Sequence, residues 1–484
     1  PHAAAAVLGG TVAEVPGVAL PAGAAADVPL TPNQARLFER RYDNPHRLNI
    51  TQMFEAQLPL HWPRLAAVIG RLSSDHDALR LRFFPDAGKP AGWRQELAAA
   101  EPGAGPVPFS LFDLSALPAT RQSGAIEQAA EALQGSLHLS RGPLVRLAAF
   151  DLGGEAGGRR PSRLLFLGHH LALDHVSLHI LADDIGRFYE AAGTGAEPRR
   201  AAASTPFQVW AERLRRFADA EELAHEAPYW LGLPWARTVR LPQDFPGGEN
   251  TGRRARVMPL DLDARDTRAL LDELPQALGA SVEEILLAAV AWSLAGWTGA
   301  PVQLLQRVGH GRISPFADLE ISRTLGWFAL DYPVVLDIST AADPQQAVAA
   351  VAEQVRRVPR EGVGYGLLRY LAREPDLAAR FRALPAAEVS FNYIGREGQR
   401  RARRDTGFQE AAESAGSVME RTARRPSLLN ATMMLAGESL RMSWTYSAAV
   451  HRAATVERLA AGCSAALSHL LSELVTTGRR RRSG

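Results

Sequence analysis

The stretch at residues 164–185, LLFLGHHLALDHVSLHILADDI, constrains the fold of this chain more than any other. It opens with an apolar run, LLFL, of the kind that forms a buried strand. From about Ser177 onward, apolar residues recur at the spacing of one helix face. Two histidines, an aspartate and a third histidine lie between these segments. The sequence therefore predicts a central strand and a helix, joined by a polar loop at the mouth of a pocket.

The length of 484 residues is too great for one ordinary hydrophobic core and suggests two domains of roughly 200 residues each. Strand-like and helix-like segments alternate in both halves, so we predict an α+β plan that is used twice. We expect a linker of small residues at 1–28, a first lobe at 29–205, a second lobe at 206–475 and a solvated basic tail at 476–484.

The segment SVEEILLAAVAWSLAGWTG is the clearest helix of the second half. Ser281 is expected at its N-cap and Glu284 three residues later, the spacing of a capping box. Its apolar character predicts a buried helix in the second lobe.

Composition excludes several classes of protein. A hydrophobic content of 46%, a charged content of 22% and a formal charge of +2 are typical of a globular protein and give no argument for nucleic acid. The single cysteine, Cys463, excludes an intrachain disulfide and a cysteine-based metal cluster. No apolar run approaches the roughly 20 residues of a membrane span, and the N-terminal residues lack the pattern of a signal peptide. We expect a cytoplasmic protein without a membrane partner.

Four side chains of the polar loop, His169, His170, Asp174 and His175, are the candidate catalytic groups. They are compatible with a proton-transfer or substrate-positioning site, a structural network or a metal site. Adjacent residues on a strand point to opposite faces, which argues against a shared metal ion on the two neighbouring histidines. We therefore expect one ring in the core, one in the pocket and no metal. Asp174 is expected to orient the loop or pair with a cation, and His179 to be peripheral.

The loop and several other motifs resemble the condensation-domain superfamily of nonribosomal peptide synthetases, whose signature is HHxxxDG. The resemblance extends from about residue 28 to 475. Besides the loop, the matching motifs in order are HDALRLRF at 76–83, SRTLGWF at 322–328, GVGYGLLRYL at 362–371 and FNYIG at 391–395.

The resemblance implies a fold of two chloramphenicol-acetyltransferase-like halves that form a V around a central tunnel. It implies that the substrate arrives in this tunnel on the phosphopantetheine arm of a carrier protein, with no cofactor bound by the chain itself. The expected partners are the peptidyl carrier protein and neighbouring synthetase domains, and the excised domain is expected to be a monomer.

Within the superfamily, four stretches of this sequence are most similar to the epimerisation branch. They are LPQDFPGGENT at 241–251, GHGR at 309–312, DLEISRTLGWF at 318–328 and LNITQ around Asn49. Such a domain inverts Cα of an aminoacyl or peptidyl thioester, which requires proton carriers on both faces and stabilisation of an enolate. The resemblance assigns one of these carriers to His170 and the other to a glutamate directly before GHGR.

Two positions depart from the pattern of the branch. Val308 stands where the glutamate is expected and cannot carry a proton. His175 stands where the signature has a glycine. His175 is compatible with a simple loop substitution, with compensation for Val308, or with a plug in the pocket.

Further residues are candidates for lining the substrate pocket. His310 is expected to share a strand face with Val308, and Arg312 to pair with Asp174 or another acid. The glycines at 362, 364 and 366 are expected to form a tight turn. The remaining candidates are Tyr365, Asn392 and Tyr393.

Three functions follow from this pattern. The first is epimerisation at Cα of a carrier-bound thioester, altered by Val308. The second is condensation or another acyl transfer, in which His170 deprotonates or positions a nucleophile. The third is a catalytically degenerate domain that only docks carrier proteins.

Overall fold

The computed structural model describes residues 12–15, 26–99, 107–155, 158–196, 204–395 and 407–482. The chain divides into two compact units, which are described separately. Unit 1 comprises Pro1–Phe217, Arg312–Phe328 and Arg400–Arg421. Unit 2 comprises Ala218–Gly311, Ala329–Gln399 and Thr422–Gly484.

This division differs from the two contiguous lobes that the sequence predicted at 29–205 and 206–475. Two segments from the second half of the sequence, 312–328 and 400–421, are built into unit 1. The second of them pairs with a strand from the beginning of the chain. Such pairings join residues that are hundreds of positions apart, and no local pattern in the sequence encodes them.

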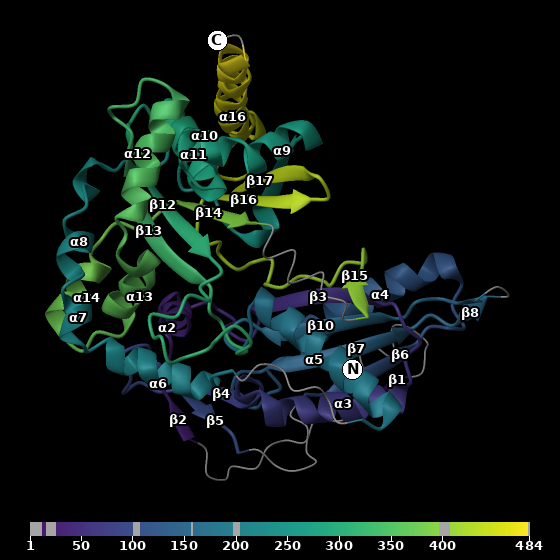
Figure 1. Ribbon diagram of the computed structural model, residues 1–484. Coiled ribbons are helices and arrows are strands. Elements are labelled where there is room, and N and C mark those ends of the chain that lie inside the picture. Colours follow the sequence, from purple (N-terminus) through teal and green to yellow (C-terminus); the bar gives the residue numbers. More distant parts are fainter. Residues whose placement is uncertain are drawn as a thin grey trace. The chain divides into compact units, whose positions relative to one another are not determined.

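Unit 1 contains a six-stranded sheet in the order β1-β6-β7-β10-β3-β15 (Figure 1). Its strands are β1 (Val12–Val15), β3 (Asn49–Ala56), β6 (Phe109–Asp113), β7 (Val145–Asp151), β10 (Arg163–His169) and β15 (Phe408–Glu410). Smaller sheets join β2 (Ala26–Val28), β5 (Trp93–Leu97) and β4 (Leu81–Pro85), and β8 (Gly154–Glu155) and β9 (Gly158–Arg159). The helices are α2 (Pro32–Glu39), α3 (Trp62–Asp75), α4 (Ala119–Gln134), α5 (His175–Thr194), α6 (Phe207–Phe217) and the 3₁₀ turn η1 (Asp77–Arg80).

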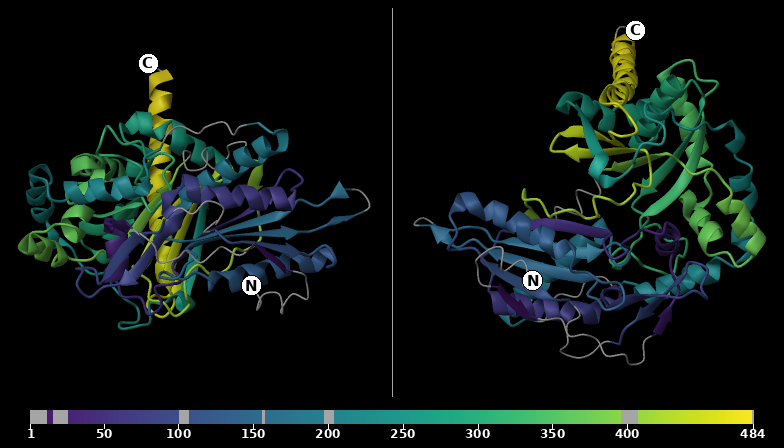
Figure 2. Two further views of the ribbon diagram at one scale, coloured as in Figure 1. Left: turned by 90° about the horizontal axis from the view of Figure 1, so that it is seen from below. Right: turned by 180° about the vertical axis from the view of Figure 1, so that it is seen from behind.

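Helices cover both faces of this sheet (Figures 1 and 2). Leu165 and Leu167 of β10 belong to the hydrophobic cluster that α4 forms on one face. On the other face Phe166 contacts Phe54, and Phe54 contacts His179 of α5. Strand β10 lies between β7 and β3 and is buried from Leu164 onward. The predicted central strand is therefore confirmed, and its continuous apolar run reflects burial on both faces.

The expected linker at 1–28 contains two strands. β1 pairs antiparallel with β6, and β2 pairs antiparallel with β5. An edge strand is held mainly by backbone hydrogen bonds, so it can form from a segment that has no amphipathic pattern.

Unit 2 contains a second six-stranded sheet in the order β11-β17-β16-β14-β12-β13. Its strands are β11 (Ala255–Leu262), β12 (Val302–Gly309), β13 (Leu330–Asp337), β14 (Val389–Ile394), β16 (Leu429–Ala436) and β17 (Ser439–Ser447). Its longer helices are α9 (Ala264–Asp272), α11 (Val282–Thr298), α12 (Pro344–Arg356), α13 (Val363–Tyr370), α14 (Pro375–Arg382) and α16 (Ala453–Arg482). Its short helices are α7 (Glu221–Ala224), α8 (Ala227–Leu231), α10 (Leu274–Leu278), η2 (Trp235–Arg237), η3 (Gly252–Arg254) and η4 (Pro359–Gly362).

Helix α11 lies between α12 and α16 against this sheet (Figure 1). The predicted capping box is present, because Glu284 N–H donates to Ser281 Oγ at 3.2 Å and Ser281 N–H donates to Glu284 Oε2 at 2.6 Å. In β16, Leu429, Ala431 and Met433 are buried, while Asn430 and Thr432 between them are partly exposed. The helices thus bury one face of the sheet and leave the other face partly open.

The closing helix α16 continues through the expected basic tail to Arg482. Arginine is a good helix former, and no proline interrupts the segment, so the helix propagates beyond the predicted end. Cys463 in this helix is fully buried, and burial raises the pKa of its thiol to about 12.

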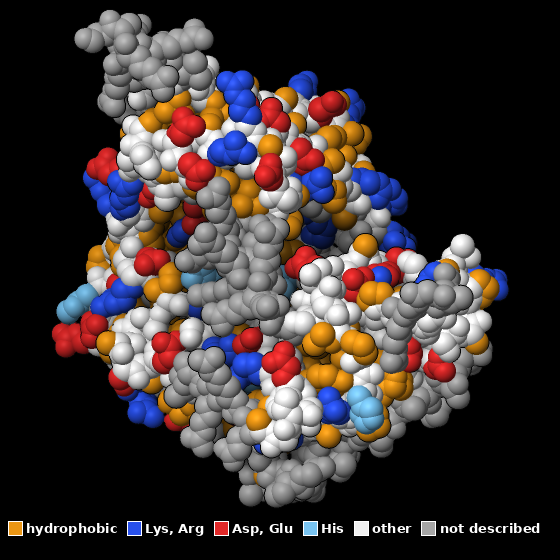
Figure 3. Space-filling view, turned by 45° about the vertical axis from the view of Figure 1, so that its right-hand side comes forward, with side chains coloured by type: hydrophobic (Ala, Val, Ile, Leu, Met, Phe, Trp, Pro, Cys, Tyr) orange, Lys and Arg blue, Asp and Glu red, His pale blue; other side chains and the backbone are white. Residues whose placement is uncertain are grey.

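None of the described helices combines the length and the hydrophobicity that a bilayer crossing requires. Acidic and basic side chains are interspersed over the face drawn in Figure 3, in keeping with the near balance of charge in the sequence.

Candidate functional site

The loop after β10 turns sharply and is fixed by backbone hydrogen bonds. His170 N–H donates to the carbonyl of Leu48 at 2.8 Å, and Leu173 N–H donates to the carbonyl of His169 at 3.2 Å. A Cβ atom at Gly168 would lie 2.5 Å from the side chain of Leu173. Glycine at this position therefore permits the close return of the loop over the end of the strand.

The two neighbouring histidines have different surroundings. His169 is fully buried, its Nε2 lies 2.9 Å from the carbonyl oxygen of Pro45, and its Nδ1 accepts the Leu171 N–H at 3.1 Å. Burial lowers the pKa of His169 to about 3. Both ring nitrogens are occupied by the backbone, so His169 holds the loop as a neutral imidazole.

His170 is partly exposed and has one ring nitrogen without a protein partner among the described residues. Its Nδ1 lies 2.9 Å from the carbonyl oxygen of Leu173. A carbonyl only accepts, so Nδ1 must carry the proton, and the lone pair of the neutral ring is on Nε2. Nε2 has no hydrogen bond to any residue that the structure describes. The ring stacks on Trp327 with centroids 4.3 Å apart.

The protonation state of His170 suits the role of a general base. Burial lowers its pKa below the ordinary value of 6.5, although the Asp174 carboxylate and the Leu173 carbonyl act in the opposite direction. The ring is therefore neutral at physiological pH, with Nε2 able to accept a proton.

Asp174 is the N-cap of α5 and pairs with a buried arginine. Its Oδ1 accepts hydrogen bonds from Ser177 N–H at 2.8 Å and from Arg312 Nη2 at 3.0 Å. Its Oδ2 accepts the Phe328 N–H at 3.2 Å. Burial raises the pKa of this carboxyl, but Arg312 and Ser177 outweigh burial and hold the pKa below 3.8. The predicted pairing with a cation is confirmed.

Arg312 anchors the segment 312–328 to the start of α5. Its Nη1 donates to the carbonyls of Ile321 at 2.9 Å and Thr324 at 2.7 Å, and its guanidinium lies 4.5 Å from the ring centroid of Phe328. The same segment supplies Trp327 to His170. Sequence reasoning did not single out Trp327, although it belongs to the SRTLGWF motif.

His175 is the first residue of α5 and is exposed. Atoms packed around part of its ring lower the pKa of His175 below 6.5, and the opposite effects of Glu410 and Asp174 do not outweigh this. His179, one turn later, was expected to be peripheral but is 8% exposed and lies against the ring of Phe54. The expectation was wrong because this part of α5 faces the sheet. Burial lowers the pKa of His179 to about 4.

Two of the candidates from the second half, Val308 and Asn392, lie on the open face of the unit 2 sheet. Val308 on β12 is in register with Asn392 on β14 and with Asp331 on β13. Residues that are directly opposite each other in adjacent strands project from the same face. Asp331, which accepts a hydrogen bond from Gln306, is thus a carboxylate beside the position of the missing glutamate. The sequence alone could not find it, because the register of two strands decides the pairing.

Two further pocket candidates, His310 and Tyr393, do not lie on the same sheet face as Val308. β12 ends at Gly309, so the exposed His310 lies beyond the strand, and the argument that it shares a face with Val308 does not apply. Tyr393 follows Asn392 on β14 and therefore projects from the opposite face.

Tyr365 lies in the core of unit 2 and not on its open face. Its ring packs on Trp230 and Phe381, with centroids 5.1 and 5.7 Å apart. Gly362 has a φ of +92°, as expected for a turn. Gly364 and Gly366 instead lie within helix α13, contrary to the predicted turn, because the helix begins directly after Gly362.

The chain is similar to several known proteins. The Condensation domain family model matches residues 24–479. A linear gramicidin synthase of Brevibacillus parabrevis is 35% identical over 92% of this chain, and chondramide synthase cmdD of Chondromyces crocatus is 36% identical over 90%. The chain spans only 6% and 11% of the lengths of these two relatives.

Solved structures share the fold. The epimerization domain from the third module of tyrocidine synthetase B superimposes with a TM-score of 0.81, at 26% identity, covering 94% of this chain and 98% of that one. The X-domain from teicoplanin biosynthesis superimposes with a TM-score of 0.72 at 20% identity, covering 94% and 97%. The predicted mixed α/β fold of two chloramphenicol-acetyltransferase-like halves is confirmed.

Proposed function

Because the chain belongs to the condensation-domain superfamily of nonribosomal peptide synthetases, we propose that it epimerises Cα of an aminoacyl or peptidyl thioester carried by a peptidyl carrier protein. The observation that carries this proposal is the contact between His170 Nδ1 and the carbonyl oxygen of Leu173, at 2.9 Å. This contact holds the Nδ1–H of the ring, which leaves the Nε2 lone pair available to a substrate. The likeness to an epimerization domain at 26% identity supports the same assignment.

The proposed reaction is two proton transfers. His170 Nε2 removes the proton from Cα, which the neighbouring thioester acidifies, and the electron pair moves onto the thioester oxygen as an enolate. A second group then delivers a proton to the opposite face of Cα. The enolate collapses to the thioester of inverted configuration.

Deuterium incorporation tests the proposal directly. The chain is incubated in D₂O with a carrier protein that is loaded with a panel of aminoacyl- and peptidyl-phosphopantetheine substrates. The released acyl groups are examined by mass spectrometry and chiral chromatography. We expect deuterium at Cα and a mixture of configurations for at least one substrate. Absence of both changes across the panel contradicts the proposal.

We further propose Asp331 as the second proton carrier, because it lies beside Val308, the position to which the family resemblance assigns the glutamate. The Asp331→Asn variant should lose inversion by at least about 100-fold, the usual range for a general acid or base. It should still incorporate deuterium with retention, because His170 can return a proton to the face from which it came. Val308→Glu in the same background should restore inversion. Chiral chromatography and deuterium content separate these outcomes.

A surface carboxylate of the same unit provides the control for this pair of variants. Asp261 on β11 is half-exposed, with a side-chain exposure of 47%, and Asp261→Asn should leave both measurements unchanged. Undiminished inversion by Asp331→Asn would remove Asp331 from the reaction.

Amide formation is the second candidate, and the observation that favours it is Val308. A condensation needs one base to deprotonate an amine nucleophile, so the absence of a carboxylate at this position does not impair it. With loaded donor and acceptor carriers, intact-protein mass spectrometry would show an acyl group gained by the acceptor. Epimerisation leaves both carriers with their original acyl groups, and a domain that only docks carriers changes neither mass nor configuration.

A further inference from the structure

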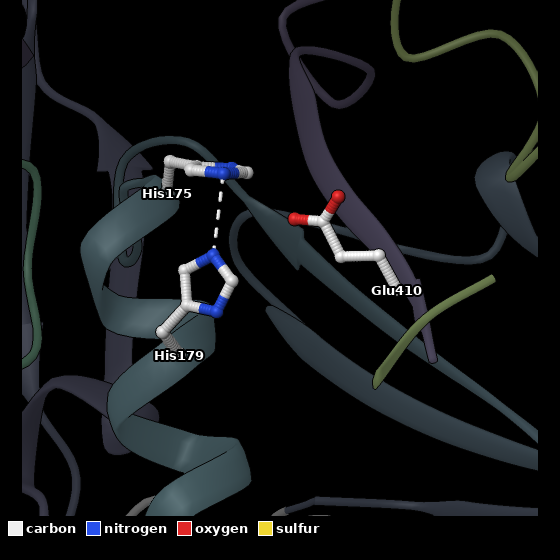
Figure 4. Close-up of side chains that lie close together, drawn as sticks. All are labelled: His175, His179 and Glu410. Carbon is white, nitrogen blue, oxygen red and sulfur yellow. Dashed lines mark hydrogen bonds between the residues drawn. The ribbon is translucent and has the colours of Figure 1, made fainter. Parts of the chain in front are cut away.

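Three potential metal ligands converge between helix α5 and strand β15 in unit 1. They are His175 and His179 from α5 and Glu410 from β15 (Figure 4). One ligand atom of each residue lies within 4.8 Å of the corresponding atoms of the other two. No sequence motif connects the three residues, because Glu410 follows His179 by more than 200 positions.

The helix sets the spacing of the two histidines. Residues four apart lie on the same helix face, so both rings project toward the same side. Their Nε2 atoms are 3.3 Å apart and share a hydrogen bond, whose proton a metal ion would replace, and the rings are nearly perpendicular, at 82° (Figure 4). Two nitrogens bound to one tetrahedral zinc ion at 2.0–2.1 Å lie about 3.3 Å from each other. The two rings are therefore already at the separation that a shared zinc ion requires.

The sheet sets the position of the carboxylate. Glu410 is in register with Phe54 on β3, so it projects from the face on which Phe54 contacts His179. Within the part of the chain that the structure describes, its carboxylate has no hydrogen bond or ion pair. The side chain is exposed and can rotate to bring an oxygen onto the ion.

We propose that His175, His179 and Glu410 bind a zinc ion. Two imidazoles and one carboxylate, with the fourth position left to water, are a common ligand set for this metal. Adjacent residues on a strand, such as His169 and His170, point to opposite faces and cannot share an ion. This limit does not apply to two histidines one helical turn apart. Zinc here would fasten β15, and with it the segment that returns to unit 1, to the start of α5.

Zinc titration of the untagged full chain tests the proposal, with Zn²⁺ alone as the probe and a chromogenic chelator as competitor. We expect one ion per chain. His175→Gln and His179→Ala should each weaken binding by at least about 100-fold, and Glu410→Gln by about 10-fold, since even outer-shell changes cost this much. Co²⁺ in place of zinc should give the intense visible absorption of tetrahedral cobalt in the wild type and lose it in the histidine variants.

A matched control and an independent readout keep the test decisive. His225 is 76% exposed and follows the short helix α7 as its C-cap, beside Glu221. His225→Ala therefore tests for binding by surface histidines and should leave the affinity unchanged. Zinc should slow amide hydrogen exchange in β15 of the wild type but not of Glu410→Gln, which alters only an exposed side chain. Failure of the wild type to bind one ion, or full affinity in any of the three ligand variants, overturns the proposal.

Discussion

Replacement of His170 by alanine is expected to lower deuterium incorporation at Cα by at least about 100-fold, the usual contribution of a general base. The expected loss follows from the position of the ring. Its Nδ1–H is held by Leu173, its face is held by Trp327, and its Nε2 has no hydrogen-bond partner among the described residues. The rate is measured by mass spectrometry on the carrier-bound thioester, after circular dichroism has shown that the variant is folded.

The pH profile adds a readout that loss of structure would not mimic. Burial lowers the pKa of His170, so the base form should persist below pH 6.5, and the wild-type rate should fall only as the pH passes through this lowered value. Any exchange left in His170→Ala should lack this limb of the profile. His225→Ala, at an exposed position, should retain the rate and profile of the wild type. Full activity in His170→Ala would instead show that another group is the base.

Replacement of Asp174 by alanine should have the largest effect on stability, about 3–5 kcal/mol, because it leaves a buried arginine without its carboxylate. The side chain of Arg312 is 1% exposed and that of Asp174 is 6% exposed. The change also removes the N-cap of α5 and the acceptor for the Phe328 N–H. Urea unfolding, followed by circular dichroism, measures the difference from wild type.

An exposed ion pair between Asp318 of the segment 312–328 and Arg213 of α6 serves as the control. Asp318 and Arg213 are 62% and 41% exposed, and exposed pairs contribute at most about 1 kcal/mol. Asp318→Ala should therefore shift the unfolding midpoint only slightly. If both variants lost the same stability, the buried pair would not be what holds the segment 312–328.

The contribution of Asp174 should also depend on pH in a defined direction. Its pKa in the folded protein lies below 3.8, so the unfolded state binds the proton more readily. The stability from this carboxylate is therefore fully present above pH 3.8 and is lost as the pH falls through the lower, folded value. The difference in stability between the wild type and Asp174→Asn should shrink over that acidic range.

Features that depend on neighbouring residues can be predicted from the amino-acid sequence alone. The apolar run before His169 identified the central strand, and Ser281 with Glu284 identified the start of α11. The HHxxxDH loop predicted His170 as the proton carrier, which stays a prediction, and the pairing of Asp174 with a cation, which Arg312 provides. Each of these signals is complete within a few residues, because helix periods, caps and buried strands are set by local geometry.

Which distant residues share a surface depends on how the chain packs in three dimensions. The return of β15 to β3 brings Glu410 to His175 and His179, and the segment 312–328 brings Trp327 to His170. Strand register sets Asp331 beside Val308. A shift of one residue in that register would turn the carboxylate to the other face, and no local pattern specifies such a pairing. Burial in the packed fold, and not spacing along the chain, distinguishes the structural histidine, His169, from His170, whose Nε2 is available to a substrate.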